Sequence, residues 1–328
     1  MIKIALDAMG SDNCPAADVE GAVIAAREFN YQIILVGDKD LIEKELDRHR
    51  PIPDSISIQH APEVIGMHEQ PVLSVRRKKQ SSIVILANLA KEKKVDAIVS
   101  AGNTGAMVCA ATLKCKLLPG IERAGIGVVM PTLKGAALMI DAGANIDAKP
   151  KHLVQYAIMG SAYSQYILNN ASPRVGLLNV GEEESKGTGF LKEAFGLLEP
   201  SGLNFIGNME GRDIFTGDCD VIVCDGLVGN VALKVSESIA HALTEILKRS
   251  LNSSLASRLG ALLSKKALYS FKSKMDYTEY GGAPLLGING ICIICHGSST
   301  PKAIKNAIRV AGEEVIKNVN QHIIEEVK

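Results

Sequence analysis

The sequence contains no tryptophan, and aromatic residues make up only 4% of its 328 positions, although 47% of the residues are hydrophobic. Aliphatic side chains and alanine must therefore fill the core, which is typical of helices packed on a buried parallel sheet. The formal net charge is zero. A neutral chain lacks the broad positive field that attracts nucleic acid, so we expect no nucleic-acid partner.

Long hydrophobic runs are also missing. No stretch reaches the roughly 18 to 20 apolar residues that a membrane-spanning helix needs. Residues 1–7 (Met-Ile-Lys-Ile-Ala-Leu-Asp) have neither the apolar segment nor the cleavage site of a secretory signal, and they predict a first strand instead. We therefore expect a cytoplasmic protein, and association with a membrane surface stays open.

The seven cysteines form no disulfide framework, because they are odd in number and dispersed, as reduced thiols are. Cys292 and Cys295 form a C-x-x-C, but the run around them predicts a buried strand, on which residues three apart point to opposite faces. A zinc site would need a turn there and a second pair of ligands. We therefore expect no metal.

Signatures of nucleotide binding and of serine hydrolases are absent. No Gly-x-Gly-x-x-Gly follows a predicted strand, and residues 181–188 hold the parts of a P-loop in the wrong order beside three glutamates that would repel phosphates. No Gly-x-Ser-x-Gly is found either. We expect no nucleotide cofactor, and no other cofactor is indicated.

Short apolar runs alternate with helical patterns along the chain. This alternation predicts an α/β fold, a mostly parallel sheet with helices on both faces, in one domain that spans residues 1–328. Two strands around Gly135, at 127–130 and 136–141, could form a hairpin or an edge pair. The other strands are predicted at 2–6, 32–36, 55–60, 96–100, 175–180, 204–207, 220–224 and 291–295, and helices at 15–28, 41–48, 81–93, 150–169, 188–198, 231–249 and 301–319, with one more helix opening at 102–105.

Six loops that follow predicted strands share one composition, a small polar residue joined to one or more glycines. Ligands of open α/β sheets bind where the carboxyl ends of strands meet loops, and exposed backbone N–H groups there favour anions such as phosphate. The six loops therefore predict one cleft for a small anion. They are Asp7–Asp12, Ser100–Gly105, Asp141–Asn145, Asn179–Glu182, Asp225–Asn230 and His296–Ser299.

A basic amphipathic region is predicted at about 246–280. From Ile246 to Met275 the chain has seven basic residues and no carboxylate, and leucines recur at three- or four-residue steps. Such a surface suits an anionic membrane or an acidic protein, although a solvated surface helix is an equal alternative. The basic residues are Lys248, Arg249, Arg258, Lys265, Lys266, Lys272 and Lys274.

Four motifs in this order resemble the PlsX family, the phosphate acyltransferases of bacterial phospholipid synthesis. They are Asp7-Ala-Met-Gly-Ser-Asp12, Ser100-Ala-Gly-Asn-Thr-Gly-Ala106, Asp225-Gly-Leu-Val-Gly-Asn-Val-Ala232 and Tyr280-Gly-Gly-Ala-Pro-Leu-Leu-Gly-Ile-Asn289. The resemblance implies transfer of an acyl group from acyl-[acyl-carrier protein] to inorganic phosphate. It also implies a fold like the isocitrate and isopropylmalate dehydrogenases, and a homodimer at the inner face of the cell membrane. The acyl phosphate would pass to a membrane-bound glycerol-phosphate acyltransferase.

Positions in the loops suggest the roles of individual residues in this reaction. We expect Lys186, His296 and the amides of the Gly10, Gly102 and Gly187 loops to hold phosphate, without a covalent acyl-enzyme. The alternatives are a solvated lysine and a structural histidine. Asn103, Thr104 and Asn230 would donate to substrate oxygens. The remaining candidates would bind substrate or fix their neighbours. The alternative is that they only cap helices or form turns. They are Asp7, Asp141, Asn145, Asn179 and Asp225.

The basic region has two candidate partners. Leu255, Leu259 and Leu262 would dip into a membrane interface, where anionic headgroups suit Arg258, Lys265 and Lys266. The same charges could instead dock the acidic carrier protein, and the cluster Arg76-Arg77-Lys78-Lys79 is a second candidate for that partner. Three other functions stay open at this point: a coenzyme A-dependent phosphate acetyl- or butyryltransferase, an isopropylmalate-type dehydrogenase, and a non-catalytic membrane scaffold.

Overall fold

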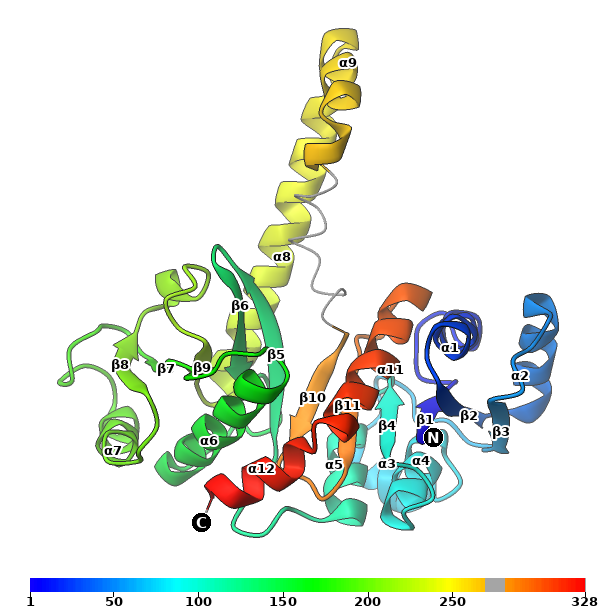
Figure 1. Ribbon diagram of the computed structural model, residues 1–328, viewed down its shortest axis with the longest axis horizontal. Coiled ribbons are helices and arrows are strands. Elements are labelled where there is room, and N and C mark those ends of the chain that lie inside the picture. Colours follow the sequence, from blue (N-terminus) through cyan, green and yellow to red (C-terminus); the bar gives the residue numbers. More distant parts are fainter. Residues whose placement is uncertain (269–280, 328) are drawn as a thin grey trace.

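Eleven strands form one continuous sheet in the computed structural model of the chain, which describes residues 1–268 and 281–327 (Figure 1). The order across the sheet is β3-β2-β1-β4-β11-β10-β5-β6-β9-β7-β8. The strands are β1 Ile2–Asp7, β2 Tyr31–Gly37, β3 Ile56–His60, β4 Ala97–Ser100, β5 Gly125–Thr132, β6 Gly135–Ile140, β7 Val175–Leu178, β8 Phe205–Met209, β9 Val221–Val223, β10 Ala283–Leu286 and β11 Ile291–Ile294.

The sheet consists of two parallel halves that run in opposite directions. Strands β3, β2, β1, β4 and β11 are mutually parallel, and so are β6, β9, β7 and β8. Between them, β10 is antiparallel to β11 and to β5, and β5 is antiparallel to β6. Three successive reversals therefore turn the carboxyl ends of the second half toward the opposite edge of the sheet.

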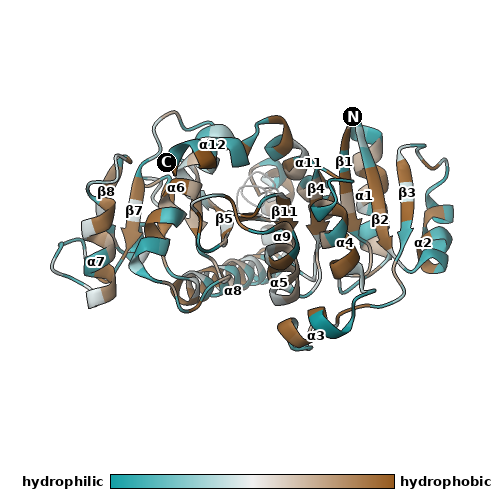
Figure 2. Cartoon of the chain, turned by 90° about the horizontal axis from the view of Figure 1, so that it is seen from below, coloured by the Kyte–Doolittle hydropathy of each residue, from teal (hydrophilic) through white to brown (hydrophobic). Residues whose placement is uncertain are grey.

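Helices cover both faces of the sheet, as the sequence predicts. In the first half, residues such as Ile4 and Leu6 pack under α1, α2 and α11, while Ala5 and Ile98 pack under α4 and α5 on the other face. Most strand residues are therefore hydrophobic (Figure 2), because alternate side chains enter different cores. The helices are α1 Ala16–Glu28, α2 Lys39–Leu46, α3 Pro71–Arg77, α4 Ser82–Lys91, α5 Thr104–Cys115, α6 Pro150–Tyr166, α7 Gly189–Leu198, α8 Gly226–Leu251, α9 Leu255–Leu263, α11 Pro301–Ile316 and α12 Val319–Glu326, with short 3-10 turns at Asp47–His49 and Gly211–Asp213.

The mostly parallel sheet and the helices on both faces confirm the predicted fold class. The hairpin around Gly135 is also confirmed, but it lies inside the sheet rather than at its edge. Three elements were not predicted: α3, α12 and the four-residue strand β10. Pro284 disguises β10, because proline lacks the N–H that a central strand normally donates.

The protruding helical region is confirmed, and within residues 246–268 the basic region is divided between the end of α8 and α9. Helix α8 begins at Gly226, five residues before the predicted start, and continues for 26 residues to Leu251. It projects from the body of the molecule and carries α9 at its far end (Figure 1). The predicted contact residues Leu255, Arg258, Leu259 and Leu262 belong to α9, and Lys265 and Lys266 follow it. Phe271, Lys272, Lys274 and Met275 lie outside the described residues.

None of the helices within residues 1–268 and 281–327 combines the length and the hydropathy that crossing a bilayer requires.

Candidate functional site

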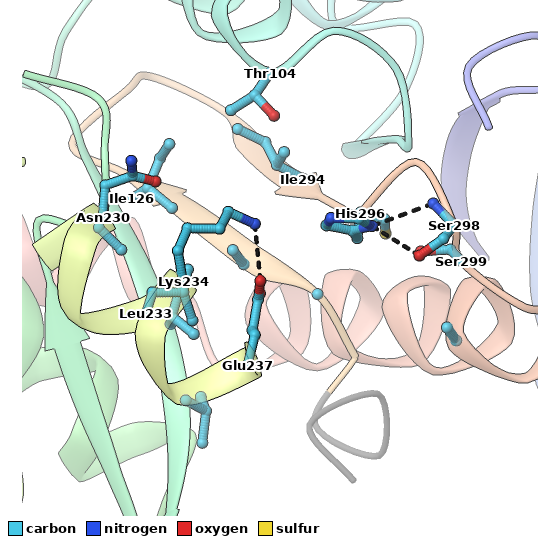
Figure 3. Close-up of a pocket in the computed structure, with 17 residues that line it drawn as sticks. Thr104, Ile126, Asn230, Leu233, Lys234, Glu237, Ile294, His296, Ser298 and Ser299 are labelled. Carbon is cyan, nitrogen blue, oxygen red and sulfur yellow. Dashed lines mark hydrogen bonds and ion pairs between the residues drawn. The ribbon is translucent and has the colours of Figure 1, made fainter. Parts of the chain in front are cut away.

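A pocket of about 180 Å³ lies over the middle of the sheet, between the start of α5, the first turns of α8 and the loop after β11 (Figure 3). Four of the six predicted loops contribute to its lining, through Thr104, Ala142, Asn230 and His296. The full lining is Thr104, Ile126, Val128, Val129, Ala142, Asn230, Leu233, Lys234, Glu237, Gly282, Ala283, Ile294, Cys295, His296, Ser298, Ser299 and Ala303.

The short strand β10 explains how loops from opposite edges of the sheet reach one pocket. Ala283, at its start, pairs with Ile294 just before the His296 loop. Leu285 pairs with Ile126, whose carbonyl accepts from the N–H of Ala142 at 2.9 Å. A strand of four residues spans only about 10 Å, so the two edges nearly meet. The sequence predicted one cleft for all six loops, and four of the six line this pocket.

Helix α5 presents its N-terminus to this pocket. Asn103 caps the helix, since its Oδ1 accepts from the N–H of Ala106 at 3.0 Å. No described residue accepts from the N–H groups of Thr104 and Gly105, which are among the donors that a helix leaves unpaired at its start. The Asn103 amide is itself occupied, because its Nδ2 donates to the carbonyls of Gly66, Met67 and Glu69.

His296 is held as a hydrogen-bond donor to the pocket. The backbone N–H of Ser298 donates to its Nδ1 at 3.2 Å, and the Ser298 hydroxyl lies 2.8 Å from the same atom (Figure 3). Because Nδ1 accepts, the neutral ring carries its proton on Nε2. The ring is exposed, so this Nε2–H is available to a ligand. Thr300, rather than Ser298 or Ser299, caps α11.

Lys234 and Glu237 are pocket residues that the sequence did not indicate. They lie on the same face of α8 as Asn230, and the Lys234 ammonium lies 2.8 Å from the Glu237 carboxylate (Figure 3). The Asn230 side chain has no hydrogen-bond partner among the described residues. The sequence feature that could have identified Lys234 is its spacing of four residues from Asn230. This spacing places both residues on one helical face, because the helix begins at Gly226.

The pocket lining also contains apolar side chains. They are Ile126 and Val128 of β5, Leu233 of α8 and Ile294 of β11. Cys295 also lines the pocket, but burial raises the pKa of its thiol to about 12. This thiol is therefore protonated at neutral pH and is a poor nucleophile.

The buried carboxylate of Asp141 organises the loops around the pocket without lining it. Asp141 accepts from the N–H groups of Ile126, Gly143, Ala144 and Asn145 at 2.7 to 3.1 Å. Burial raises the pKa of this carboxyl, and the N–H bonds oppose that shift. The Asn145 amide donates in turn to the carbonyl of Ala124 and to Tyr156. Asp141 and Asn145 are thus engaged within the protein.

Asp7 and Asp225 hold their own loops in a similar way. Asp7 accepts from the hydroxyl of Ser100 at 2.8 Å, and burial raises the pKa of its carboxyl. Gly10 packs so closely on Gly102 that a Cβ at position 10 would lie 2.6 Å from the Gly102 nitrogen, so the two loops fit together only with glycine there. Asp225 caps α8 through the N–H groups at 227 and 228.

Lys186, Gly187 and Asn179 lie apart from the pocket lining. The Asn179 amide donates to Asn208 Oδ1 at 3.1 Å, and its Oδ1 accepts from the N–H of Val180. The Lys186 ammonium lies 3.8 Å from Glu183 in the same loop. This loop follows β7, which is two strands away from β6 in the sheet.

The described residues contain no group of three or more His, Cys, Asp or Glu side chains with the arrangement of a metal site. Cys292 and Cys295 enter separate cores on the two faces of the sheet, which agrees with their predicted positions on a strand.

Asp18 is a buried carboxylate beside the first loop. Its Oδ2 accepts from the Ser11 hydroxyl at 2.7 Å, while its Oδ1 has no partner among the described residues. Burial raises the pKa of Asp18 to about 7, and the nearby Asp7 adds to that shift.

Comparison with known proteins places the chain in a family. Residues 2–322 match a family described as fatty acid synthesis protein. The phosphate acyltransferase of Geotalea daltonii is 50% identical over 327 residues, which cover 100% of this chain and 94% of that relative.

Solved structures share the fold at much lower identity. A phosphotransacetylase from Streptococcus pyogenes has a TM-score of 0.64 at 17% identity, covering 96% of this chain and 94% of that one. A putative 4-hydroxythreonine-4-phosphate dehydrogenase from Salmonella typhimurium has a TM-score of 0.55 at 12% identity, with coverage of 95% and 99%. The fold is therefore common to phosphate acyltransferases and to dehydrogenases.

Asp18 makes stability depend on pH in a direction opposite to that of most carboxylates. Its folded pKa of about 7 exceeds the ordinary aspartate pKa of 3.8, so the folded state keeps a proton that the unfolded state releases, and stability falls as pH rises from about 4 to about 7. Asp18→Asn should remove this fall, which is on the order of 2 kcal/mol between pH 5 and 7. Urea unfolding at both pH values measures it. The exposed neighbour variant Asp12→Asn should keep the slope of the native protein, and an unchanged slope in Asp18→Asn would contradict the assignment.

Proposed function

The chain belongs to the fatty acid synthesis protein family and is an enzyme that transfers acyl groups to phosphate, and we propose that the pocket between α5, α8 and β11 is its active site. The acyl donor in this proposal is the thioester of an acyl-carrier protein, and the product is an acyl phosphate for phosphatidic acid synthesis. The observation that carries it is the meeting of unpaired polar donors and apolar side chains in one pocket.

In this proposal, phosphate binds among the polar groups that line the pocket. The N–H groups of Thr104 and Gly105, at the positive end of α5, face an anion. His296 Nε2–H and the Lys234 ammonium approach from the other elements. Asn230 is placed to donate to the thioester carbonyl or to a phosphate oxygen. Glu237 orients the Lys234 ammonium through their ion pair.

The chemistry then needs little more than positioning. A phosphate oxygen attacks the thioester carbonyl carbon, the new C–O bond forms, and a negative charge develops on the carbonyl oxygen. Donors already in place stabilise that charge. The C–S bond breaks, and the proton of hydrogen phosphate ends on the departing thiolate, so that hydrogen phosphate and thioester give acyl phosphate and thiol. Holding both reactants in one pocket lowers the entropic part of the activation barrier, because the reactants no longer have to meet in solution.

A direct attack also agrees with the state of the nearest thiol. Cys295 is the lining cysteine, and burial holds its pKa at about 12. A route through an acyl-cysteine would first have to ionise this thiol, at a cost of several kcal/mol at neutral pH.

The apolar side chains of the pocket are suited to the first methylene groups of the acyl chain. Ile126, Val128, Leu233 and Ile294 lie among the polar donors in the lining (Figure 3). Apolar contacts then hold the chain while the polar groups hold the phosphate and the carbonyl.

We place the tip of the molecule at the membrane. Leu255, Leu259, Leu262 and Leu263 of α9 are 63% to 89% exposed, and Arg258 lies among them while Lys265 and Lys266 follow. A leucine face bordered by cations fits an anionic bilayer interface. The location would bring the acyl phosphate to a membrane-bound glycerol-phosphate acyltransferase.

We also propose that a second copy of the chain covers α8. Val231, Val235 and Ile239 recur at four-residue steps and are 51% to 54% exposed, and Leu243 continues the row. A long apolar row on a single helix is costly in water and is the pattern of a self-complementary helix interface. This apolar row lies on the side of α8 opposite the pocket residues, as the helical spacing requires.

The active site can be tested with long-chain acyl-carrier protein and labelled phosphate, by following the labelled acyl phosphate. His296→Ala and Lys234→Met should each lower kcat/KM for phosphate about 100-fold, because each removes a donor to the reacting anion. Lys186→Met is the matched control, since this lysine lies outside the pocket lining, and it should retain near-native values. Native kinetics in both pocket variants, or a comparable loss in Lys186→Met, would reject this site.

The membrane contact predicts the behaviour of a double variant of α9. Leu255→Glu with Leu259→Glu should release the protein from anionic phosphatidylglycerol vesicles in a sedimentation assay, because carboxylates are repelled by the headgroups. Soluble acyl transfer should be unchanged. Leu41→Glu, on the exposed surface of α2, should leave vesicle binding intact. If acyl transfer falls while vesicle binding persists, α9 serves the carrier protein instead.

The helix interface predicts a change in oligomeric state. Val235→Glu with Ile239→Glu should convert a dimer into a monomer in light scattering coupled to size exclusion, because the paired faces would bury four carboxylates. Leu133→Glu at the tip of the β5–β6 hairpin, which is 89% exposed, should leave the mass unchanged. A native mass for the α8 variant would place the interface elsewhere.

A further inference from the structure

A second hollow lies at the far end of α5 and is strongly basic. It is a groove of about 630 Å³ whose lining contains four cations and no carboxylate. Its residues come from α3 and the loop after it, from α4 and from the last turn of α5. They are Val75, Arg76, Lys79, Gln80, Val84, Asn88, Lys91, Leu113 and Lys114.

The four cations of the groove are not used within the protein. Among the described residues, Arg76, Lys79, Lys91 and Lys114 have no ion pair. Their neighbour Lys78 differs, because its ammonium lies 2.6 Å from Glu69. Gathering four unneutralised positive charges is unfavourable by their mutual repulsion, so the groove has an electrostatic preference for an anionic partner.

The floor of the groove is apolar and its shape is built by packed helices. Val75 and Val84 are buried at the base, while Leu113 is 59% exposed beside them. Helix α3 is fixed on α5, since Pro71 packs against Gly105, and α4 packs on α5 as well. A concave surface with cations around a leucine fits the acidic amphipathic helix of a protein better than a flat bilayer.

The groove is connected to the active-site pocket by α5 itself. The helix begins at Thr104 in the pocket and ends next to Lys114 in the groove. Ten residues of α-helix correspond to about 15 Å. A phosphopantetheine arm has a length equivalent to about five extended residues, or about 16 to 18 Å, so an arm anchored at the groove reaches the pocket.

We propose that this groove docks the acidic carrier protein that delivers the acyl thioester. The inference rests on the proposed function, because it assigns the donor protein of that reaction to a surface. Carboxylates on one helix of the carrier pair with Arg76, Lys79, Lys91 and Lys114, an apolar side chain meets Leu113, and the arm follows α5 to Thr104. Arg258 of α9 and the following Lys265 and Lys266 remain for the bilayer.

The test separates docking from chemistry by using two acyl donors. Arg76→Glu, Lys79→Glu and Lys114→Glu together should raise KM for acyl-carrier protein at least about tenfold, because attraction becomes repulsion. KM for a small donor, the acyl thioester of N-acetylcysteamine, should stay native. The matched control reverses three exposed lysines elsewhere, Lys44→Glu, Lys192→Glu and Lys317→Glu, and should keep both KM values. For the native protein, KM for the carrier should rise with salt, because salt screens the attraction. In the groove variant it should instead fall with salt, because salt screens the repulsion.

Direct binding distinguishes a failure of this surface from a failure of the proposed reaction. Calorimetry with carrier protein that bears the arm but no acyl group should show binding by the native chain and not by the groove variant, whether or not acyl phosphate is formed. Equal affinity in both proteins overturns the docking surface. Equal loss with the two acyl donors overturns it as well, because the groove would then only support the pocket. Reduced binding to phosphatidylglycerol vesicles with a native KM for the carrier would assign the groove to lipid and reject the proposal.

Discussion

The reversal of strand direction in the middle of the sheet is the constraint on which the site depends. Parallel halves alone would place their loops at opposite edges, too far apart to share a ligand. The four residues of β10 reduce that separation to about 10 Å. The start of α5 and the His296 loop, from one half, therefore face Asn230 and Ala142 from the other. Both halves are needed to build a single pocket.

Buried carboxylates keep the loops of this pocket in place. Asp141 satisfies four backbone N–H groups, and Asp7 ties the first loop to Ser100. These bonds fix backbone positions that glycine-rich segments would otherwise leave variable, at the expense of desolvating a charge. The donors that remain unpaired, at Thr104, Gly105 and His296, are then preorganised before any ligand arrives.

The sequence predicted the fold well because its alternation of strands and helices is strong, and because four motifs identified the family. The sequence predicted the loops, but it did not predict which of their side chains are free to bind a ligand. Asn103, Asn145 and Asn179 are engaged by backbone and side-chain partners that lie far away in the sequence. No local pattern encodes such pairings.

Two lysines illustrate the limit of the prediction in physical terms. Lys186 has the chemistry and the glycine neighbours of an anion site, but the strand order places its loop away from the pocket lining. Lys234 lies in the pocket but was not predicted, because the candidate residues came from loops and Lys234 lies in the third turn of a helix. Strand order and the true start of α8 were the missing information, and both are set by tertiary packing.

The length of α8 has a consequence for how the enzyme stands on a surface. The helix has no proline, and its glycines lie only in the first turn, so it acts as a stiff strut. From Lys234 to Leu251 it rises about 26 Å. In the proposed orientation, with α9 on a bilayer, α8 holds the proposed catalytic pocket at a set height above the lipid, open to donors that diffuse in water, and an acyl phosphate would cross that gap to reach the membrane.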